Sequence, residues 1–264
     1  TFWISFEKFH LNWEFSWPWL NLGNVFSERI DWIQWYEYTG VFGGSLWVLC
    51  ANFLLFNLLR KYSIFKDKRR FYIRIIPRIL LISFPIFVSL LVKPKINKGE
   101  EFRVLITQPK IDPWEAKYGN SQSNLDYFKI FKDLTNEELS DNEYDFVFTS
   151  ETYFSEGYGE NVDYFRYTKL YDSLNNYLSQ FNNTNLISGI QFYKLYQNQN
   201  EKPTKSANPV RDNIWVDYFN SSINMSANKG FEYNHKSKLV VGSEYMPFKS
   251  FLEPIIGTVM IDLG

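Results

Sequence analysis

Residues 40–59 read GVFGGSLWVLCANFLLFNLL, a run of twenty residues without a charge. A helix rises ~1.5 Å per residue, so this run spans ~30 Å, the thickness of the hydrocarbon core of a bilayer. A second run, residues 75–92 (IIPRILLISFPIFVSLLV), is shorter and contains Arg78, which can snorkel from near a helix end. The alternative for both runs is a buried helical hairpin in a soluble protein. We expect two membrane helices, because the first run is long and free of charge.

The segment between the two runs, residues 60–70, carries six basic residues and one acid. Short loops rich in Lys and Arg remain in the cytoplasm. The first helix is therefore expected to enter the cytoplasm, and the second helix to leave it. Everything after Val92 is then expected outside, which in a bacterium is the periplasm. The predicted location is the bacterial cytoplasmic (inner) membrane, crossed several times.

Residues 1–39 mix Trp, Phe, Pro and Asn without a clean period, and we expect the end of one more membrane helix near residues 2–13. Tryptophan concentrates where an apolar surface meets water, which favours a membrane interface here. The loop through Trp17-Pro18-Trp19 is either an aromatic belt or part of a lipid-facing site. Residues 1–92 are thus predicted to form a membrane region. The first residue is Thr1 rather than Met, so we expect an internal fragment of a longer protein.

Composition excludes several classes of function. The net charge of -1 and the pI near 6.2 give no basic field, so no nucleic-acid partner is expected. The single cysteine, Cys50, excludes an intrachain disulfide framework. With two histidines in the chain, a histidine-based metal cluster is not expected either, and no cofactor is predicted.

After a linker at residues 93–101, short apolar runs alternate with polar helices. Strands alternating with helices of this length predict an α/β domain over residues 102–264. The polar residues 197–212 are expected to form a loop. The expected strands are 103–108, 145–149, 185–192 and 213–219, and the helix-like spacings fall at 121–134 and 164–181.

Glu151 directly follows the apolar run 146–149. A carboxylate at the exit of a buried strand is partly desolvated, which raises its pKa and suits it to act as a general base. The alternative is a surface acid in a turn.

Lys236 and Lys238 precede the strand-like residues 239–241, and Glu244 follows them. A lysine here would supply a fixed positive charge to a developing oxyanion, and Glu244 would be a second carboxylate in the same cleft. Alternatively the lysines are charges at a strand edge and Glu244 is a loop acid.

Three stretches together resemble the carbon–nitrogen hydrolase (nitrilase) superfamily: QPKID at 108–112, SET at 150–152 and YNHKSKLVVGSEYMP at 233–247. They are joined to aromatic-rich stretches, WPWLNLG at 17–23 and QWYEYTGVFGG at 34–44. In this combination the chain is similar to the apolipoprotein N-acyltransferase family, and in particular to its Bacteroidetes branch. The resemblance implies a nitrilase-like α-β-β-α sandwich, incomplete in this chain, attached to transmembrane α-helices.

The resemblance also implies roles for individual residues. Glu151 resembles the general base of the family, although Ser150 stands where the family has proline. Lys236, rather than the second lysine of the segment, resembles the lysine that stabilises the oxyanion, and Glu244 resembles a further glutamate of the site. The nucleophilic cysteine of the family is expected beyond Gly264.

The implied reaction moves an acyl chain from a phospholipid, through a cysteine thioester, to the α-amino group of the S-diacylglyceryl-cysteine of apolipoproteins, which completes lipoprotein maturation. The expected partners are the phospholipid donor, the diacylglyceryl-modified apolipoprotein acceptor and the membrane. The protein is expected to be a monomer, and these 264 residues alone to be inactive. Two alternatives remain: a membrane-tethered amidase of the nitrilase type, and a non-catalytic membrane binding protein that kept the fold and lost the thiol.

Overall fold

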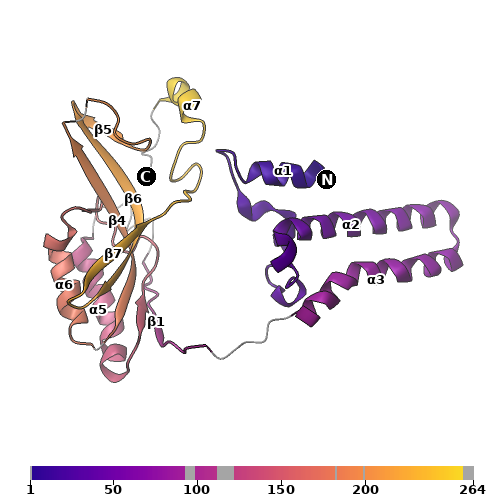
Figure 1. The fold of residues 1–264 in the computed structure, drawn as a ribbon, viewed down its shortest axis with the longest axis horizontal. Helices are drawn as coiled ribbons and strands as arrows, with labels where there is room; N and C mark the ends of the chain where they lie inside the picture. Colours follow the sequence, from indigo (N-terminus) through magenta and orange to yellow (C-terminus); the bar gives the residue numbers. More distant parts are fainter. Residues whose placement is uncertain (1, 93–98, 112–121, 182, 199, 258–264) are drawn as a thin grey trace. The chain divides into compact units, whose positions relative to one another are not determined.

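The computed structural model describes residues 2–92, 99–111, 122–181, 183–198 and 200–257. The chain divides into two compact units, Thr1–Lys98 and Gly99–Gly264 (Figure 1). Most of the expected linker at 93–101, namely residues 93–98, lies outside the described residues.

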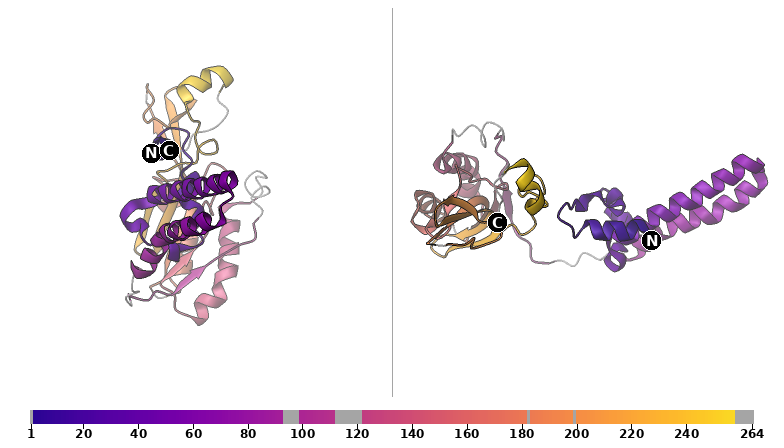
Figure 2. Two further views of the ribbon diagram at one scale, coloured as in Figure 1. Left: turned by 90° about the vertical axis from the view of Figure 1, so that its right-hand side faces the viewer. Right: turned by 90° about the horizontal axis from the view of Figure 1, so that it is seen from above.

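The first unit consists of helices, two of which are long. Helix α2 and helix α3 run side by side as a hairpin (Figure 2). A short helix, α1, and three short 3-10 helices precede the hairpin. Their bounds are α1 Phe2–His10, η1 Pro18–Leu20, η2 Leu22–Phe26, η3 Ile30–Trp32, α2 Tyr36–Phe65 and α3 Lys68–Val92.

Two stretches of these helices, Tyr36–Ile64 and Lys68–Val92, are long and apolar enough to cross a membrane. A core helix of a soluble protein would be buried, but only 17% and 6% of their most apolar windows are buried. The hairpin therefore exposes a large apolar surface, whose contact with water is energetically unfavourable. The large exposed side chains are Phe53, Leu55, Phe56, Leu59, Ile73, Ile76, Ile79, Leu80, Leu81, Phe84, Phe87, Leu90 and Leu91.

The structure corrects the expected basic loop at residues 60–70. Helix α2 continues through most of it, and Lys66, with φ of 55° in the left-handed region, ends that helix. Helix α3 already begins at Lys68, so the connection consists of Lys66 and Asp67. Arginine and lysine are good helix formers, and a helix pairs the backbone groups that a loop would leave open.

Among the residues that the structure describes, the second unit is built on one mixed sheet of seven strands. Its main path runs β1-β2-β4-β6-β5, with β3 added to β4 and β7 added to β6. β1, β2 and β4 are parallel, whereas β6 is antiparallel to β4, β5 and β7. The strands are β1 Val104–Ile106, β2 Phe146–Phe148, β3 Glu160–Asn161, β4 Asn185–Gln197, β5 Asn208–Arg211, β6 Ile214–Ser226 and β7 Gly230–His235.

Helices α5 (Asn124–Asp141) and α6 (Lys169–Leu178) contact each other and supply one side of the core. Their buried residues recur at helical spacing, and the sheet meets them with alternate residues of its strands. The short helices η4 (Phe165–Tyr167) and α7 (Lys249–Ile256) complete the unit. Fully buried core side chains include Phe131, Leu174, Leu178, Leu186, Ile190, Phe192 and Met225.

The α/β class is confirmed, and three expectations within it are corrected. The expected loop at 197–212 contains strand β5, which pairs with β6. Strand β6 continues past Phe219 to Ser226, because β4 and β7 hydrogen-bond its polar residues. Residues 239–241 form no strand and take part only in an isolated bridge, Val241 to Tyr245. The described residues form one sheet with helices, and the four-layer sandwich is not confirmed.

Candidate active site

The candidate site lies where four neighbouring strands bring their residues together. Glu151 follows β2, Gly189 lies on β4, Asn220 lies on β6 and Lys236 follows β7. A cavity of about 370 Å³ opens between them. Its lining residues are Thr149, Ser150, Glu151, Ile187, Ser188, Gly189, Asn220, Ser221, Ser222, Asn234 and Lys236.

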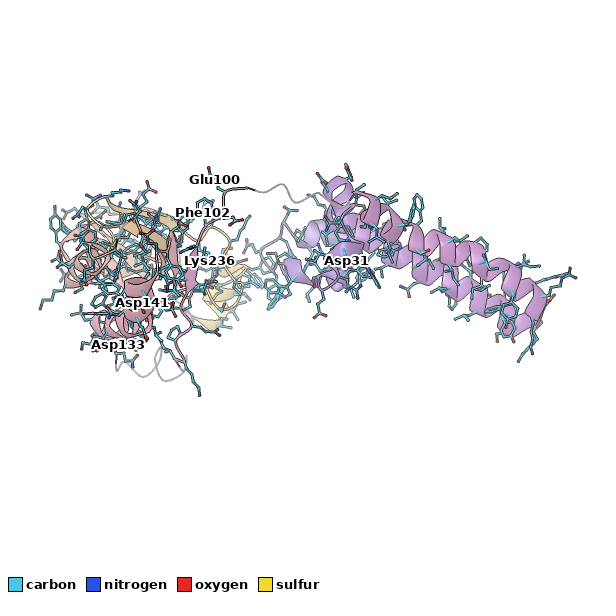
Figure 3. The ribbon with its side chains drawn as sticks, turned by 90° about the horizontal axis from the view of Figure 1, so that it is seen from below. Asp31, Glu100, Phe102, Asp133, Asp141 and Lys236 are labelled. Carbon is cyan, nitrogen blue, oxygen red and sulfur yellow. The ribbon has the colours of Figure 1, made fainter. Side chains whose placement is uncertain are left out.

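Lys236 (labelled in Figure 3) holds the centre of the site. Its Nζ donates to Oε1 of Glu151 at 3.0 Å and to Oε1 of Glu244 at 2.8 Å. The structure thus brings together all three residues that the sequence singles out. Lys236 lies one residue after β7, not before a strand as expected, and the strand pairing of β7 with β6 fixes its position. Its backbone N–H donates to the carbonyl of Asn220 at 2.8 Å.

Asn220 is a fourth member of this cluster. Its Nδ2 donates to Oε1 of Glu151 at 2.6 Å and to Oε1 of Glu244 at 3.2 Å. Its side-chain carbonyl accepts from the hydroxyl of Thr152 at 3.4 Å. The residue is 7% exposed, so both of its polar groups are buried and partnered. The side-chain amide of Asn220 therefore hydrogen-bonds the carboxylates of Glu151 and Glu244 to strand β6.

Glu244 sits in a tight turn that fixes its carboxylate. Its Oε2 accepts from the backbone N–H of Val240 at 2.6 Å, and its own N–H donates to the carbonyl of Val240 at 2.9 Å. Gly242, with φ of 78°, supplies the left-handed residue of the turn. The turn makes Glu244 the more buried of the two carboxylates, with 14% of its side chain exposed.

The turn that carries Glu151 lies directly against β4. A Cβ on Gly189 would come within 2.3 Å of the backbone nitrogen of Thr152 and within 2.5 Å of the carbonyl oxygen of Ser150. Thr152 also adopts a φ of 54°, which is uncommon for a residue with a side chain. Only a glycine at 189 lets this turn approach so closely, so the position of Glu151 depends on a residue of the neighbouring strand.

The charges of the cluster stabilise one another. Burial lowers the pKa of Lys236, but the bonds to Glu244 and Glu151 outweigh burial, and its pKa is raised above 10.5. Burial raises the pKa of Glu244, but the bonds from Lys236, Val240 and Asn220 outweigh it, and its pKa is lowered from 4.5. An ammonium and a carboxylate that reinforce each other remain charged over the whole neutral range.

The expected burial of Glu151 is wrong. Its side chain is 64% exposed, because β2 ends at Phe148 and the turn then carries the carboxylate out of the sheet. Its environment is set instead by the donors Lys236 and Asn220. The arrangement thus presents a carboxylate that can accept a proton beside a fixed positive charge, which suits chemistry that creates and discharges an oxyanion.

Sequence reasoning missed part of the cavity wall. Ser221 Oγ lies 2.7 Å from Nδ1 of His235, and the imidazole stacks on Phe219 at 4.0 Å between ring centroids. Burial, helped by Lys194, lowers the pKa of His235 and favours the neutral ring. Asn220 and Gly189 were missed as well, since only the pairing of β4 with β6 and β7 brings them to the site. The one signal available is the run NSSINMS at 220–226, whose alternation fits a strand.

No group of three or more His, Cys, Asp or Glu side chains that could hold a metal ion occurs in the part of the chain that the structure describes. The cluster at Lys236 contains two carboxylates, and both form an ion pair with the Lys236 ammonium.

Two comparisons with known proteins, one with family models and one with individual curated proteins, both find apolipoprotein N-acyltransferases. The model of the apolipoprotein N-acyltransferase N-terminal domain matches residues 1–54. The apolipoprotein N-acyltransferase of Chlorobaculum tepidum is 29% identical over 119 residues, which are 43% of this chain and 21% of the relative. The match thus spans about a fifth of the length of that curated relative. The chain is therefore similar to apolipoprotein N-acyltransferases over its first 54 residues and over the 119 residues aligned with this relative.

Proposed function

We propose that the chain is part of an apolipoprotein N-acyltransferase in which Glu151 is the general base, Lys236 stabilises the oxyanion and Glu244 holds Lys236 in place. The observation that carries this proposal is the Lys236 ammonium, bonded to both carboxylates at 2.8 and 3.0 Å beside a cavity of about 370 Å³. Acyl transfer through a thiolate uses a proton acceptor and a stabilised oxyanion, and here a carboxylate and an ammonium lie next to space for an ester.

In the first step a cysteine thiol gives its proton to Glu151, and the thiolate attacks an ester carbonyl of a phospholipid. The negative charge that develops on the carbonyl oxygen is stabilised by the Lys236 ammonium. The intermediate collapses to a thioester, and the departing lysophospholipid oxygen takes the proton back from Glu151. The thiol is the component that the sequence analysis expects beyond Gly264. Cys50 lies within α2, in the unit Thr1–Lys98, and does not line the cavity beside Lys236.

In the second step the α-amino group of an S-diacylglyceryl-cysteine attacks the thioester. Glu151 accepts the proton that the amine loses, Lys236 again stabilises the oxyanion, and the thiolate leaves with the amide bond formed. Glu244 takes no proton in either step, since its lowered pKa keeps it ionised as the partner of Lys236. The exposure of Glu151 supports its separate role, because it leaves room for a substrate to approach.

The proposal also assigns a location to each part of the chain. Residues 1–92 form the membrane region, and residues 102–264 are the N-terminal part of a nitrilase-like α-β-β-α sandwich on the periplasmic side of the cytoplasmic membrane. The apolar, exposed faces of α2 and α3 support membrane attachment. A diacylated acceptor and a phospholipid donor both reside in a bilayer, so attachment places the enzyme beside its substrates.

The test is a set of variants of the complete protein assayed for N-acylation of a diacylated apolipoprotein. Glu151→Gln and Lys236→Met are each expected to lower turnover by about 10²–10³-fold or more, as loss of an oxyanion donor or a base does. Lys238→Met is the matched control, since this exposed lysine lies two residues away and is no part of the cluster. Wild-type turnover in either site variant would overturn the assignment. Release of free fatty acid without transfer would favour the amidase instead.

A further inference from the structure

The hairpin of α2 and α3 encloses a second cavity, of about 230 Å³, near its turn. The cavity lies within the first unit and contains none of the candidate active-site residues. Both helices contribute to it, so it exists only when the hairpin is formed. Its lining residues are Leu58, Lys61, Tyr62, Asp67, Arg70, Phe71 and Arg74.

The lining carries three cations and one carboxylate, a net charge of two positive units. The carboxylate is already engaged: Asp67 accepts from the backbone N–H of Arg70 at 3.0 Å and forms an ion pair with its Nε at 3.2 Å. For Lys61 and Arg74, the described part of the chain offers no side-chain ion pair. The lining therefore contains two exposed cations that form no ion pair within the described residues.

The base of the cavity is apolar and firmly packed. Leu58 is 2% exposed, and the rings of Tyr62 and Phe71, one from each helix, lie 4.8 Å apart. Toward the other end of the hairpin the exposed surface is apolar, with Phe56 and Leu59 on α2 and Ile73 on α3. A charged cavity is thus continuous with an apolar surface, at the level where two candidate membrane spans end.

We propose that this cavity binds the phosphate group of an anionic phospholipid. Lys61 and Arg74 donate charge-assisted hydrogen bonds to the phosphate oxygens, and Arg70, held by Asp67, adds positive charge. The acyl chains lie along the exposed apolar faces of α2 and α3. A phosphate fits better than a carboxylate, because the lining carries two units of unmatched charge and a guanidinium with forked donors.

The alternative is that the basic residues act only as diffuse charge that orients the hairpin in a membrane. The chain contains its own control for this alternative. Lys68 and Arg69 belong to the same basic segment and are exposed, but they do not line the cavity. A diffuse role treats all these residues alike, whereas a binding site depends on the residues of the lining.

The experiment compares three forms of the full chain in neutral detergent: wild type, Lys61→Gln with Arg74→Gln, and Lys68→Gln with Arg69→Gln. Native mass spectrometry measures the fraction bound to dioleoylphosphatidylglycerol and, separately, to dioleoylphosphatidylcholine. Inorganic phosphate is then added as a competitor. Both double variants lose two charges and place good helix formers at exposed positions, and circular dichroism checks that both keep their helices.

The proposal predicts that the lining variant binds phosphatidylglycerol about tenfold more weakly or worse, the loss expected for charge-assisted hydrogen bonds, while the control variant binds like wild type. Phosphatidylcholine, whose headgroup has no net charge, is expected to bind more weakly than phosphatidylglycerol to the wild type. Equal losses in the two variants would overturn the proposal in favour of diffuse charge. Displacement of the lipid by inorganic phosphate at comparable concentration would also overturn it, since a free anion would then be the occupant.

Discussion

At the scale of single residues, two hydrogen-bond donors of the site, Lys236 and Asn220, are shared by two carboxylates. One oxygen of Glu151 accepts from both Lys236 and Asn220, and one oxygen of Glu244 accepts from the same two donors. The same two donors thereby hold both carboxylates, and they help to lower the pKa of Glu244. The second oxygen of Glu244 is bonded to the backbone of Val240. In the proposed mechanism Glu244 is therefore a positioning residue, whereas Glu151, whose side chain is 64% exposed, is the carboxylate that reaches the substrate.

The pKa values of this cluster predict how stability depends on pH. The pKa of Glu244 is lower in the folded chain than its usual 4.5, so its contribution is complete above that value and is lost as pH falls through the folded value. The pKa of Lys236 is raised, so its contribution is complete below 10.5 and is lost only as pH rises through the higher folded value. At neutral pH both residues are therefore expected to contribute fully to the stability of the fold.

We therefore expect wild type to unfold at a higher temperature than Glu244→Gln at about pH 6, and the difference to shrink toward about pH 3. Thermal unfolding of the full chain, followed by circular dichroism at several pH values, measures it. A difference that stays constant across this range would mean that the charge of Glu244 does not contribute.

At the scale of elements, the candidate site is an outcome of strand pairing. Gly189 belongs to β4, and because it has no side chain the turn after β2 can pack directly against that strand. Gly189→Ala forces the methyl group against the backbone of Thr152, at 2.3 Å without adjustment. Overpacking of this kind costs about 1–3 kcal/mol, and the turn that carries Glu151 has to move.

The variant is expected to lower both the urea midpoint of unfolding and the rate of N-acylation of the complete protein. Gly99→Ala is the control, because a Cβ there has nothing within 4 Å. If Gly189→Ala matched the control in both measurements, the close approach of the turn to β4 would not matter for the site.

At the scale of the whole molecule, the two units have different surfaces. The unit Gly99–Gly264 buries a core between helices and sheet, whereas the helices of Thr1–Lys98 leave most of their apolar surface exposed. Expressed separately, residues 99–264 are expected to remain in solution and to unfold cooperatively in urea. Residues 1–98 are expected to require detergent. Precipitation of residues 99–264 without detergent would contradict this division, and far-ultraviolet circular dichroism with sedimentation checks it.

Much of this organisation could be predicted from the sequence. The rest depends on which strands pair with each other and in which register, and the sequence alone does not reveal this. The two long apolar helices and the strands β1, β2 and β4 were predictable because their apolar runs are long or continuous. The apolar residues 239–241 misled the prediction, whereas β7, with its exposed Glu232, is a strand because β6 pairs with it. The sequence motifs named Glu151, Lys236 and Glu244, but the contribution of Asn220 follows only from the register of β6. The catalytic roles of all these residues stay predictions.

The cluster also joins parts of the chain that are far apart in sequence. Lys236 and Glu151 are separated by 85 positions, and Asn220 and Glu151 by 69. Contacts of such separation form late, because long loops must close first. Glu151 and Lys236 therefore meet only after β4, β6 and β7 have paired. A chain still leaving the ribosome therefore carries these three residues without the cluster that they form, until the sheet has folded.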